Sequence, residues 1–295
     1  MADERRGGRS RGGGGGGGGG RGASRQVLIS KALSTLLRHQ AGNAGIPLDS
    51  EGFAPLDRVM QWPRLRSLNP TLAEIRNEVA TNAKQRFSMK PSPDGEAAPD
   101  EGDAAHWLIR ANQGHSIALA SEGLHAPVTL EAGNVPDVVV HGTYFAFWPA
   151  IVEAGGLKAM GRTHVHFGTG LPDGEAGQVH GAEEETGSVI SGMRADAEVL
   201  VFVDVERALR EEPGIKWWLS ENRVVLTEGD ARGLVPVRFF KEVRGRRQGV
   251  GVLWRDGVQV ADLPEGVVAR VPQGKGRAGG ERGGRGGRRG RGRGS

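Results

Sequence analysis

Four separated segments of the chain combine arginine and histidine with small residues, a composition that suits the binding of an anionic group. Planar guanidinium groups bind phosphate oxygens through two parallel hydrogen bonds, whereas a lysine offers only a point charge. Taken singly, each segment has an ordinary explanation, such as a helix C-terminus, a surface charge on a strand or a turn. The segments are Arg38-His39, Arg110 to His115, His141-Gly142-Thr143 and Ile190 to Arg194.

Other motifs point to chemistry less convincingly. The glycines from Gly168 to Gly174 follow no clear strand and depart from the G-x-G-x-x-G spacing, so we expect no Rossmann site. His164 and His166 would share one face of a strand, but a third ligand in register is not apparent, so we expect no metal. The chain contains no cysteine, which excludes a disulfide framework and a thiolate nucleophile. It also lacks the Walker A and G-x-S-x-G sequences.

The first half of the chain contains the elements that would position Arg38 and Arg110. Apolar spacing predicts an amphipathic helix over residues 27–39, with Arg38 opposite the buried stripe, and a short helix near 56–60. Thr71 and Glu74 form a capping box that opens a third helix ending near residue 82. Strands are predicted at 85–89 and 106–111, joined by an acidic, proline-rich segment at 91–105. Three helices and a hairpin predict a winged-helix lobe over residues 25–125.

The second half changes to short apolar runs bounded by glycine and proline. These predict strands near 138–140, 199–205, 223–226 and 235–239, with a helix over 148–154. The run 155–185 is rich in glycine, histidine and acids, and we expect an exposed loop there. The pattern indicates an α+β lobe over residues 126–243. A C-terminal extension, 244–272, contains a further strand pair at 249–254 and 258–263.

The two ends of the chain differ in composition from its interior. Residues 1–24 and 273–295 hold 23 of the 50 glycines and carry net charges of +3 and +7, which leaves −6 for the residues between. Such Arg-Gly tails cannot bury enough apolar surface to fold, but they offer mobile cations to a polyanion such as RNA. We expect disordered tails, for which RNA contact and simple solubilisation remain equally open.

Hydropathy and charge also bear on location. No stretch approaches ~18 consecutive apolar residues, so we expect no membrane span. The start of the chain lacks the apolar core of a signal peptide. Arg-rich tails suit the nucleus, the cytoplasm or both, and we expect a monomer.

Six motifs in a fixed order, together with the long segment that follows them, resemble the RNA 2′-phosphotransferases of the KptA family. The resemblance covers residues 25–243, and it is far more specific than any single motif. The segments are LSTLLRH, KQRF, IRANQGHS, VHGTY, GRTHVHF and ISGMRADAEVLVFVD, followed by SENRVVLTEGDARGLVPVRFFKEV.

The resemblance implies an enzyme that removes an internal 2′-phosphate from RNA, as left at a tRNA splice junction, and passes it to NAD⁺. A 2′-phosphate oxygen attacks the nicotinamide-bearing ribose carbon and expels nicotinamide. The ribose 2″-hydroxyl then attacks the same phosphorus, which releases 2′-hydroxyl RNA and ADP-ribose 1″,2″-cyclic phosphate. The family's catalytic set of three arginines and a histidine is placed on Arg38, His39, Arg110 and Arg194. Our hypothesis is that Arg38, His39 and Arg110 clamp the phosphate, while Arg194 acts mainly on the transition state of the second step.

The resemblance also implies an ADP-ribosyltransferase-like second lobe that binds NAD⁺ as co-substrate, without a metal. The expected NAD⁺ contacts are His141, Gly142, Thr143, His166, Ser191 and Gly192. The expected contacts to flanking RNA are Lys84, Arg86, Asn112, Gln113 and His115.

Two other functions remain open at this point. The same pocket could serve an ADP-ribosyltransferase that modifies terminal phosphates of RNA or DNA and stops after the first step. A non-catalytic nucleic-acid binder could use the winged helix and the tails. The identity of the product separates the first alternative from a phosphotransferase, and NAD⁺ consumption separates the second.

Overall fold

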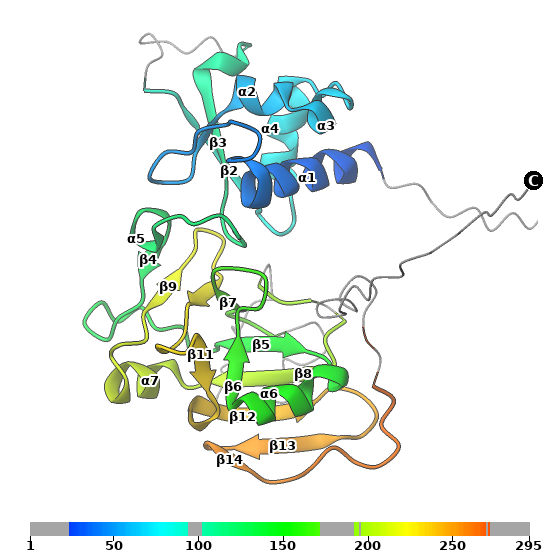
Figure 1. Cartoon of the computed structure of the whole chain (residues 1–295), viewed down its shortest axis with the longest axis vertical. Helices are drawn as coiled ribbons and strands as arrows, with labels where there is room; N and C mark the ends of the chain where they lie inside the picture. Colours follow the sequence, from blue (N-terminus) through cyan, green and yellow to red (C-terminus); the bar gives the residue numbers. More distant parts are fainter. Residues whose placement is uncertain (1–23, 94–101, 172–191, 195, 270, 272–295) are drawn as a thin grey trace, which may run out of the picture.

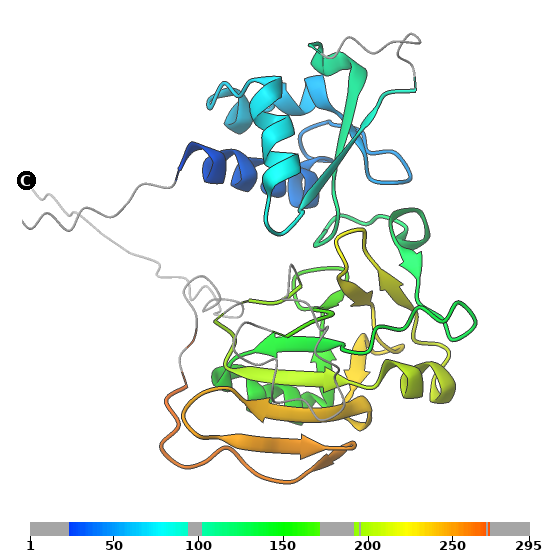
Figure 2. The ribbon, with the colours of Figure 1, turned by 180° about the vertical axis from the view of Figure 1, so that it is seen from behind.

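The computed structural model describes residues 24–93, 102–171, 192–194, 196–269 and 271. These residues form a mixed α and β structure with several separate sheets. Two lobes lie one above the other along the longest axis, a helical lobe at one end and a mainly β lobe at the other (Figure 1). The same separation is visible from behind (Figure 2). Each lobe has its own hydrophobic core, built from residues 29–111 in the first and 128–254 in the second.

The first helix carries two of the predicted site residues at its end. α1 (Arg25–Thr35) begins after Ser24, whose side chain accepts a hydrogen bond from the Val27 amide. It continues into a π-helical turn, η1 (Leu36–Gln40), which contains Arg38 and His39. A π-helical turn shifts the side chains after it relative to the regular helix, and such turns are frequent at functional sites.

The remaining elements of the helical lobe follow the predicted pattern. The capping box of Thr71 and Glu74 is present at the start of α4. The hairpin strands belong to a three-stranded antiparallel sheet with the order β1-β3-β2. The short helix α3 is an addition that the sequence pattern does not predict. The elements are β1 (Ala54–Pro55), α2 (Leu56–Gln61), α3 (Pro63–Arg66), α4 (Leu72–Thr81), β2 (Phe87–Pro91), the 3₁₀ helix η2 (Ala104–His106) and β3 (Trp107–Ala111).

The β lobe contains three sheets among the described residues. A five-stranded sheet has the order β14-β13-β12-β8-β5, a four-stranded sheet the order β4-β9-β10-β7, and β11 pairs with β6. The strands are β4 (Ala126–Pro127), β5 (Val140–Thr143), β6 (Gly156–Lys158), β7 (Val165–Phe167), β8 (Val199–Val203), β9 (Trp217–Leu219), β10 (Val225–Thr227), β11 (Leu234–Pro236), β12 (Phe240–Gly245), β13 (Gly251–Arg255) and β14 (Val258–Gln259). The helices are α5 (Ser121–Leu124), η3 (Phe145–Phe147), α6 (Trp148–Ala154), α7 (Val205–Glu211) and η4 (Val237–Phe239).

The sheets meet over a core of large aromatic side chains. Phe145, Phe167, Trp217 and Phe240 are fully or almost fully buried in one cluster. An isolated bridge between Val140 and Gly168 joins the edge of the five-stranded sheet to the end of β7. This bridge brings the predicted NAD⁺ segments, at 141–143 and 166, side by side.

Comparison with the predicted elements gives one correction in this lobe. The helix at 148–154 and the strand pair β13-β14 are confirmed, the latter with Asp256 and Gly257 at positive φ in the turn. The exposed loop expected at 155–185 is wrong for its first part, because β6 and β7 lie there and the side chain of His166 is buried. Residues 172–185 lie outside the described part of the chain. Among the helices that the structure describes, none is long and apolar enough to span a membrane.

Candidate active site

Arg38 presents a partly buried cation that forms no ion pair with the described residues. Its guanidinium packs against the backbone of Gly114, where an added Cβ would lie 3.4 Å from Cζ, and Gly114 has a φ of +90°. Its Nε and Nη2 atoms are buried and find no hydrogen-bond partner in the described residues. Burial, followed by the charges of Arg162 and Arg86, lowers the pKa of Arg38 to about 10. Unpartnered buried donors are rare and costly, so this arrangement is suited to an incoming anion.

His39 lies beside Arg38 and is held by the segment that links the two lobes. Its Nδ1 is 2.9 Å from Ser116 Oγ, and the Ser116 amide donates to the Arg38 carbonyl at 3.0 Å. Burial, and then the charges of Arg38 and Arg162, lower the pKa of His39. His39 is therefore neutral at pH 7 in the free protein and can act as a hydrogen-bonding group next to the cations.

Arg86 shares the electrostatic environment of Arg38. It stands just before β2, and its Nη1 donates to Asn82 Oδ1 at 3.1 Å. The charge of Arg86 lowers the pKa of both Arg38 and Lys84. The family resemblance assigns Arg86 only to flanking RNA, but its position makes it a partner of Arg38.

Arg110 is placed differently from the prediction that it would join Arg38 on the phosphate. Its guanidinium lies 4.7 Å from the Phe53 ring centre, and it donates to the Glu51 carbonyl at 3.0 Å and to Glu221 Oε2 at 2.9 Å. A carboxylate therefore already neutralises this arginine. The structure groups Arg86, and not Arg110, with Arg38.

The β lobe supplies two further arginines. Arg194 Nη1 donates to the Tyr144 hydroxyl at 3.3 Å, and that hydroxyl donates to Asp196 Oδ1 at 2.9 Å. Arg162 is not singled out by the sequence motifs, yet its charge lowers the pKa of Arg38 and of His39. Burial and then the charge of Arg194 lower the pKa of Arg162 itself. The cluster thus consists of Arg38, Arg86, Arg162 and Arg194, drawn from both lobes.

The segment 141–143 forms most of β5 and packs tightly against the loop that carries Arg194. At Gly142, an added Cβ would lie 2.4 Å from Met193 Cγ and 2.8 Å from Ala197 Cβ. Thr143 is buried, and its carbonyl accepts from the Glu198 amide at 2.8 Å. Glycine is therefore required at 142 by the packing of the protein itself, whether or not a ligand also approaches there.

His141 and His166 both have a defined proton position. His141 Nδ1 lies 2.9 Å from the His166 carbonyl, and His166 Nδ1 lies 2.9 Å from the His164 carbonyl. Because a carbonyl only accepts, Nδ1 must carry the proton in each ring. Burial, followed by the charge of Arg162, holds the pKa of His166 well below its usual range, so this ring is neutral. Its Nε2 is then a buried acceptor, and it has no partner in the described part of the chain.

Gly192 adopts a conformation that other residues rarely take. Its φ is +88°, and an added Cβ would lie 2.8 Å from the Phe167 carbonyl oxygen. The close approach is to the β7 backbone, which fixes the start of the loop leading to Arg194. Ser191 lies outside the described residues.

The residues expected to contact flanking RNA fall into two groups. Asn112, Gln113 and His115 are buried, with 5%, 6% and 4% of their surfaces exposed, and their contact with RNA stays a prediction. Both amide atoms of Asn112 are used within the lobe, by Ser88 and by the Gln85 carbonyl. Lys84 is more accessible, and its Nζ donates to the Met193 carbonyl at 3.4 Å.

The polar histidine neighbourhood is not arranged as a metal centre. His164 Nε2 is 2.9 Å from Ser121 Oγ and 3.6 Å from Glu228 Oε1. Within the described ranges, no group of three or more histidine, cysteine, aspartate or glutamate side chains could hold a metal ion.

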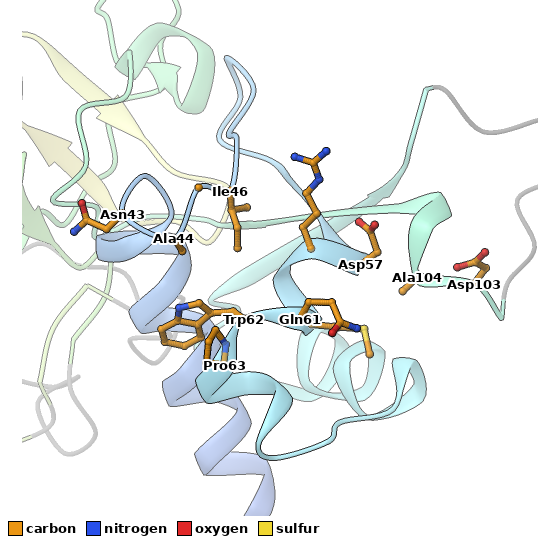
Figure 3. A pocket seen from close by; sticks show the side chains of 12 residues that line it. Asn43, Ala44, Ile46, Asp57, Gln61, Trp62, Pro63, Asp103 and Ala104 are labelled. Carbon is orange, nitrogen blue, oxygen red and sulfur yellow. The ribbon is translucent and has the colours of Figure 1, made fainter.

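A large cavity lies away from the arginine cluster. It has a volume of about 880 Å³ and lies in the helical lobe between the 43–46 turn, α2 and Asp103, with Trp62 forming one wall (Figure 3). Its ionisable lining consists of Arg58 with Asp57 and Asp103. Two carboxylates against one guanidinium do not suit a doubly charged phosphate.

Comparison with known proteins bears on most of the described chain. The model of the family described as RNA 2′-phosphotransferase, Tpt1/KptA family, matches residues 24–229. The chain is 41% identical over 218 residues to tRNA 2′-phosphotransferase 1 of Bos taurus, a match that covers 74% of this chain and 75% of the bovine protein. It is 33% identical over 221 residues to tRNA 2′-phosphotransferase of Saccharomyces cerevisiae, covering 74% and 84% of the two chains.

Proposed function

Because the chain belongs to the Tpt1/KptA family of RNA 2′-phosphotransferases, we propose that it transfers an internal 2′-phosphate of spliced tRNA to NAD⁺. The products are 2′-hydroxyl RNA, nicotinamide and ADP-ribose 1″,2″-cyclic phosphate. The enzyme is a transferase, and NAD⁺ is its co-substrate.

The cluster of four arginines from both lobes is the observation that carries this proposal. A phosphate monoester holds nearly two negative charges, and Arg38 offers two unpartnered buried donors to it. Charge-assisted hydrogen bonds contribute about 1.5–3 kcal/mol each. A site with several such donors binds a dianion strongly even though the interior of the chain is acidic overall.

We propose that the helical lobe binds the 2′-phosphate. Arg38, His39 and Arg86 lie together there, and Arg86 takes the place that the sequence suggests for Arg110. A substrate that is already anionic needs no general base for its attack on the nicotinamide-bearing ribose carbon. The main requirement of this first step is orientation of the phosphate towards the ribose.

Arg194 and Arg162 approach from the β lobe, which we infer to be the ADP-ribosyltransferase-like, NAD⁺-binding lobe. In the second step charge develops on the phosphoryl oxygens and on the departing RNA 2′-oxygen, and donors aimed at these atoms lower the barrier. The Tyr144 hydroxyl, held by Asp196, limits the rotamers of Arg194 and so orients this donor. We propose that Arg194 acts mainly in this second step.

The NAD⁺ contacts come from β5 and β7. His166 Nε2 is a neutral acceptor that would gain its missing hydrogen bond from an N–H or O–H of the nicotinamide riboside. His141 and Thr143 line the neighbouring strand, and Gly192 starts the loop that closes the site. The helical lobe, which we infer to be a winged helix, presents Lys84 and Arg86 to the RNA.

The direct test is incubation of the protein with a 2′-phosphorylated oligoribonucleotide, with and without NAD⁺. We expect dephosphorylated RNA and ADP-ribose 1″,2″-cyclic phosphate only when NAD⁺ is present. Retention of ADP-ribose on the RNA would favour the alternative, an ADP-ribosyltransferase that stops after the first step. Binding without NAD⁺ consumption would indicate a non-catalytic nucleic-acid binder.

In the same assay, variants of Arg86 and Arg194 distinguish the two steps of the reaction. We expect Arg86→Ala to abolish nicotinamide release, whereas Arg194→Ala releases nicotinamide and accumulates ADP-ribosylated RNA phosphate. Equal loss of both products in the Arg194 variant would contradict the division of roles. The exposed Arg58 of α2 provides a matched control, since Arg58→Ala leaves the cluster intact.

We also propose that the protein acts in the nucleus, the cytoplasm or both, on the basis of the Arg-Gly tails. Imaging of a fluorescent fusion with and without residues 273–295 tests whether this tail directs the location. An unchanged distribution would remove the tail from that role.

A further inference from the structure

One turn of the β lobe reaches the hairpin of the helical lobe. This turn, residues 220–223 between β9 and β10, is rigid: Ser220 Oγ donates to Asn222 Oδ1 at 2.9 Å, and Arg223 takes a positive φ of 61°. The Arg223 amide closes the turn by donating to the Ser220 carbonyl at 2.9 Å. The side chain of Asn222 is almost fully buried, with 1% of the residue exposed. The turn therefore presents Glu221 and Asn222 in fixed positions.

Glu221 joins the two hairpin strands from the opposite lobe. Its Oε2 accepts from Arg110 Nη2 at 2.9 Å and lies 2.8 Å from Ser88 Oγ, whose single proton is shared between Glu221 and Asn112 Oδ1. Ser88 on β2 and Arg110 on β3 are directly paired in the sheet, so one carboxylate oxygen contacts both strands. Charge-assisted bonds of this kind are about twice as strong as neutral ones.

Asn222 contacts the segment that carries Arg86. Its Nδ2 donates to the Lys84 carbonyl at 2.9 Å. From within the helical lobe, Asn112 fixes the next two carbonyls: its Nδ2 donates to Gln85 and its backbone amide to Arg86, at 2.8 and 2.9 Å. Lys84, Gln85 and Arg86 are thus held by one asparagine from each lobe.

Arg110 is already occupied by protein groups. The Phe53 ring packs against its guanidinium, and the Glu51 carbonyl and Glu221 accept two of its hydrogen bonds. Only 13% of its side chain is exposed, against 54% for Glu221. At Arg110 only Nε lacks a partner, and a substrate phosphate would have to displace a carboxylate from Nη2, whereas Arg38 has both Nε and Nη2 without a partner in the described residues.

We propose that Glu221 and Asn222 form an interlobe clamp, with Arg110 as its partner in the helical lobe, that positions Arg86 against the NAD⁺-binding lobe. Arg110 is then a positioning residue that acts through Glu221, and not a phosphate ligand. The inference rests on the proposed function, because the reaction requires a phosphate held by one lobe to meet a ribose held by the other. A small change in the register of the lobes misaligns these groups and slows transfer.

Exchange of the two charges tests the clamp. We compare Arg110→Glu, Glu221→Arg and the double variant in single-turnover transfer from a 2′-phosphorylated oligoribonucleotide, with NAD⁺ affinity measured separately. Each single variant should transfer at least about 10-fold more slowly, with unchanged NAD⁺ affinity, because the hydrogen bonds of the Arg110 and Glu221 side chains go to Glu51, Ser88 and each other, and not to the described residues expected to contact NAD⁺. The double variant should regain most of the rate. Glu211→Arg, which breaks an ion pair within α7, is the control and should leave the rate unchanged.

The outcomes are distinct. A double variant that is no faster than its slower parent would overturn the clamp, and selective loss of RNA affinity in every Arg110 variant would instead make Arg110 a phosphate ligand. If the wild-type protein itself shows no NAD⁺-dependent transfer, the proposed function fails, which is a separate result.

If the charge-exchange variants do not fold, Asn222→Ala provides a second test of the clamp. The variant loses two bonds, from Ser220 Oγ to Asn222 Oδ1 and from Asn222 Nδ2 to the Lys84 carbonyl. Ser220 Oγ keeps the Val224 carbonyl as an acceptor and the Arg223 amide still donates to the Ser220 carbonyl, so the turn retains its closing bonds and the bond lost between the lobes is the one to Lys84. The chain has no cysteine, so spin labels at Arg66→Cys and Lys241→Cys report the distance between the lobes. We expect slower transfer and a broader distance distribution in Asn222→Ala. A wild-type rate and distribution would overturn the proposal.

Discussion

Replacement of Arg38 by lysine keeps the charge and removes the geometry, which makes it a sharp test of the phosphate site. Arg38 has two buried atoms, Nε and Nη2, that are available to bind two phosphate oxygens. The lysine ammonium is a point charge at the end of a shorter side chain, so it cannot form the two parallel hydrogen bonds of the guanidinium. Loss of one charge-assisted hydrogen bond, worth about 1.5–3 kcal/mol, corresponds to a rate or affinity about 10- to 150-fold lower.

The same substitution should introduce a pH dependence that the wild-type protein lacks. Burial and then the charges of Arg162 and Arg86 lower the pKa of Arg38 to about 10. The same causes would lower the pKa of a lysine at this position from its ordinary value of about 10.4. Lysine is cationic below its pKa, so the activity of Arg38→Lys should persist at pH 7 and fall as the pH rises towards 9. Wild-type Arg38 stays charged over this range.

The assay is single-turnover transfer from a 2′-phosphorylated oligoribonucleotide at saturating NAD⁺, between pH 6.5 and 9. Arg58→Lys, a matched change at an exposed arginine of the same lobe, should follow the wild-type profile. A full rate for Arg38→Lys at pH 7 would show that Arg38 does not bind phosphate through two donors. If the ratio of the Arg38→Lys rate to the wild-type rate stays constant up to pH 9, the site does not lower the pKa of a cation at this position.

Three further changes follow from the same contacts. Gly142→Ala should lower the melting temperature by roughly 2–10 °C, since the new methyl overlaps Met193 and overpacking costs about 1–3 kcal/mol; differential scanning fluorimetry checks this. His166→Phe removes a buried acceptor and should weaken NAD⁺ binding about 5- to 150-fold in a calorimetric titration; it also removes the Nδ1 donor to the His164 carbonyl, so the melting temperature should fall as well. Burial, then the charges of His164 and Arg110, lower the pKa of His125 to about 4, so the folded state resists protonation and loses stability as the pH falls below 6.5. Urea unfolding of His125→Gln should therefore show roughly 1–2 kcal/mol less loss of stability between pH 7 and 5.

Sequence patterns were sufficient to predict the structural features that depend only on residues close together in the chain. The capping box at Thr71 and Glu74 forms as predicted, because its two hydrogen bonds close within four residues. The helix over 148–154 is confirmed with Gly155 at its C-cap, where a left-handed residue ends the helix. These features need no information from the rest of the chain.

The choice between Arg86 and Arg110 could not be made in the same way. Both lie on or beside the hairpin strands, and each fits a phosphate-binding segment by residue type. Successive side chains of a strand point to opposite faces, so a shift of one residue exchanges the two environments. Only the tertiary structure shows that Arg110 faces Glu221 of the other lobe while Arg86 acts on Arg38.

The burial of the polar segment 112–115 could not be predicted from the sequence, for a related reason. Its composition favours exposure, but it fills the junction between the lobes, where the backbone and side chains of both must find hydrogen-bond partners. The His115 carbonyl accepts from both the amide and the hydroxyl of Thr163, at 3.1 and 2.9 Å. Polar residues are required at this junction because it is buried, which a sequence pattern alone does not reveal.

The distribution of carboxylates explains how an acidic interior keeps a cationic site. Glu221 is taken by Arg110 and Ser88, and Asp196 by the Tyr144 hydroxyl, so each of these acids is engaged by another group. Arg38 accordingly keeps Nε and Nη2 without a partner in the described residues. In the proposed clamp, Arg110 engages Glu221 and holds the lobes together, and this is why an arginine outside the cluster is expected to matter for the reaction.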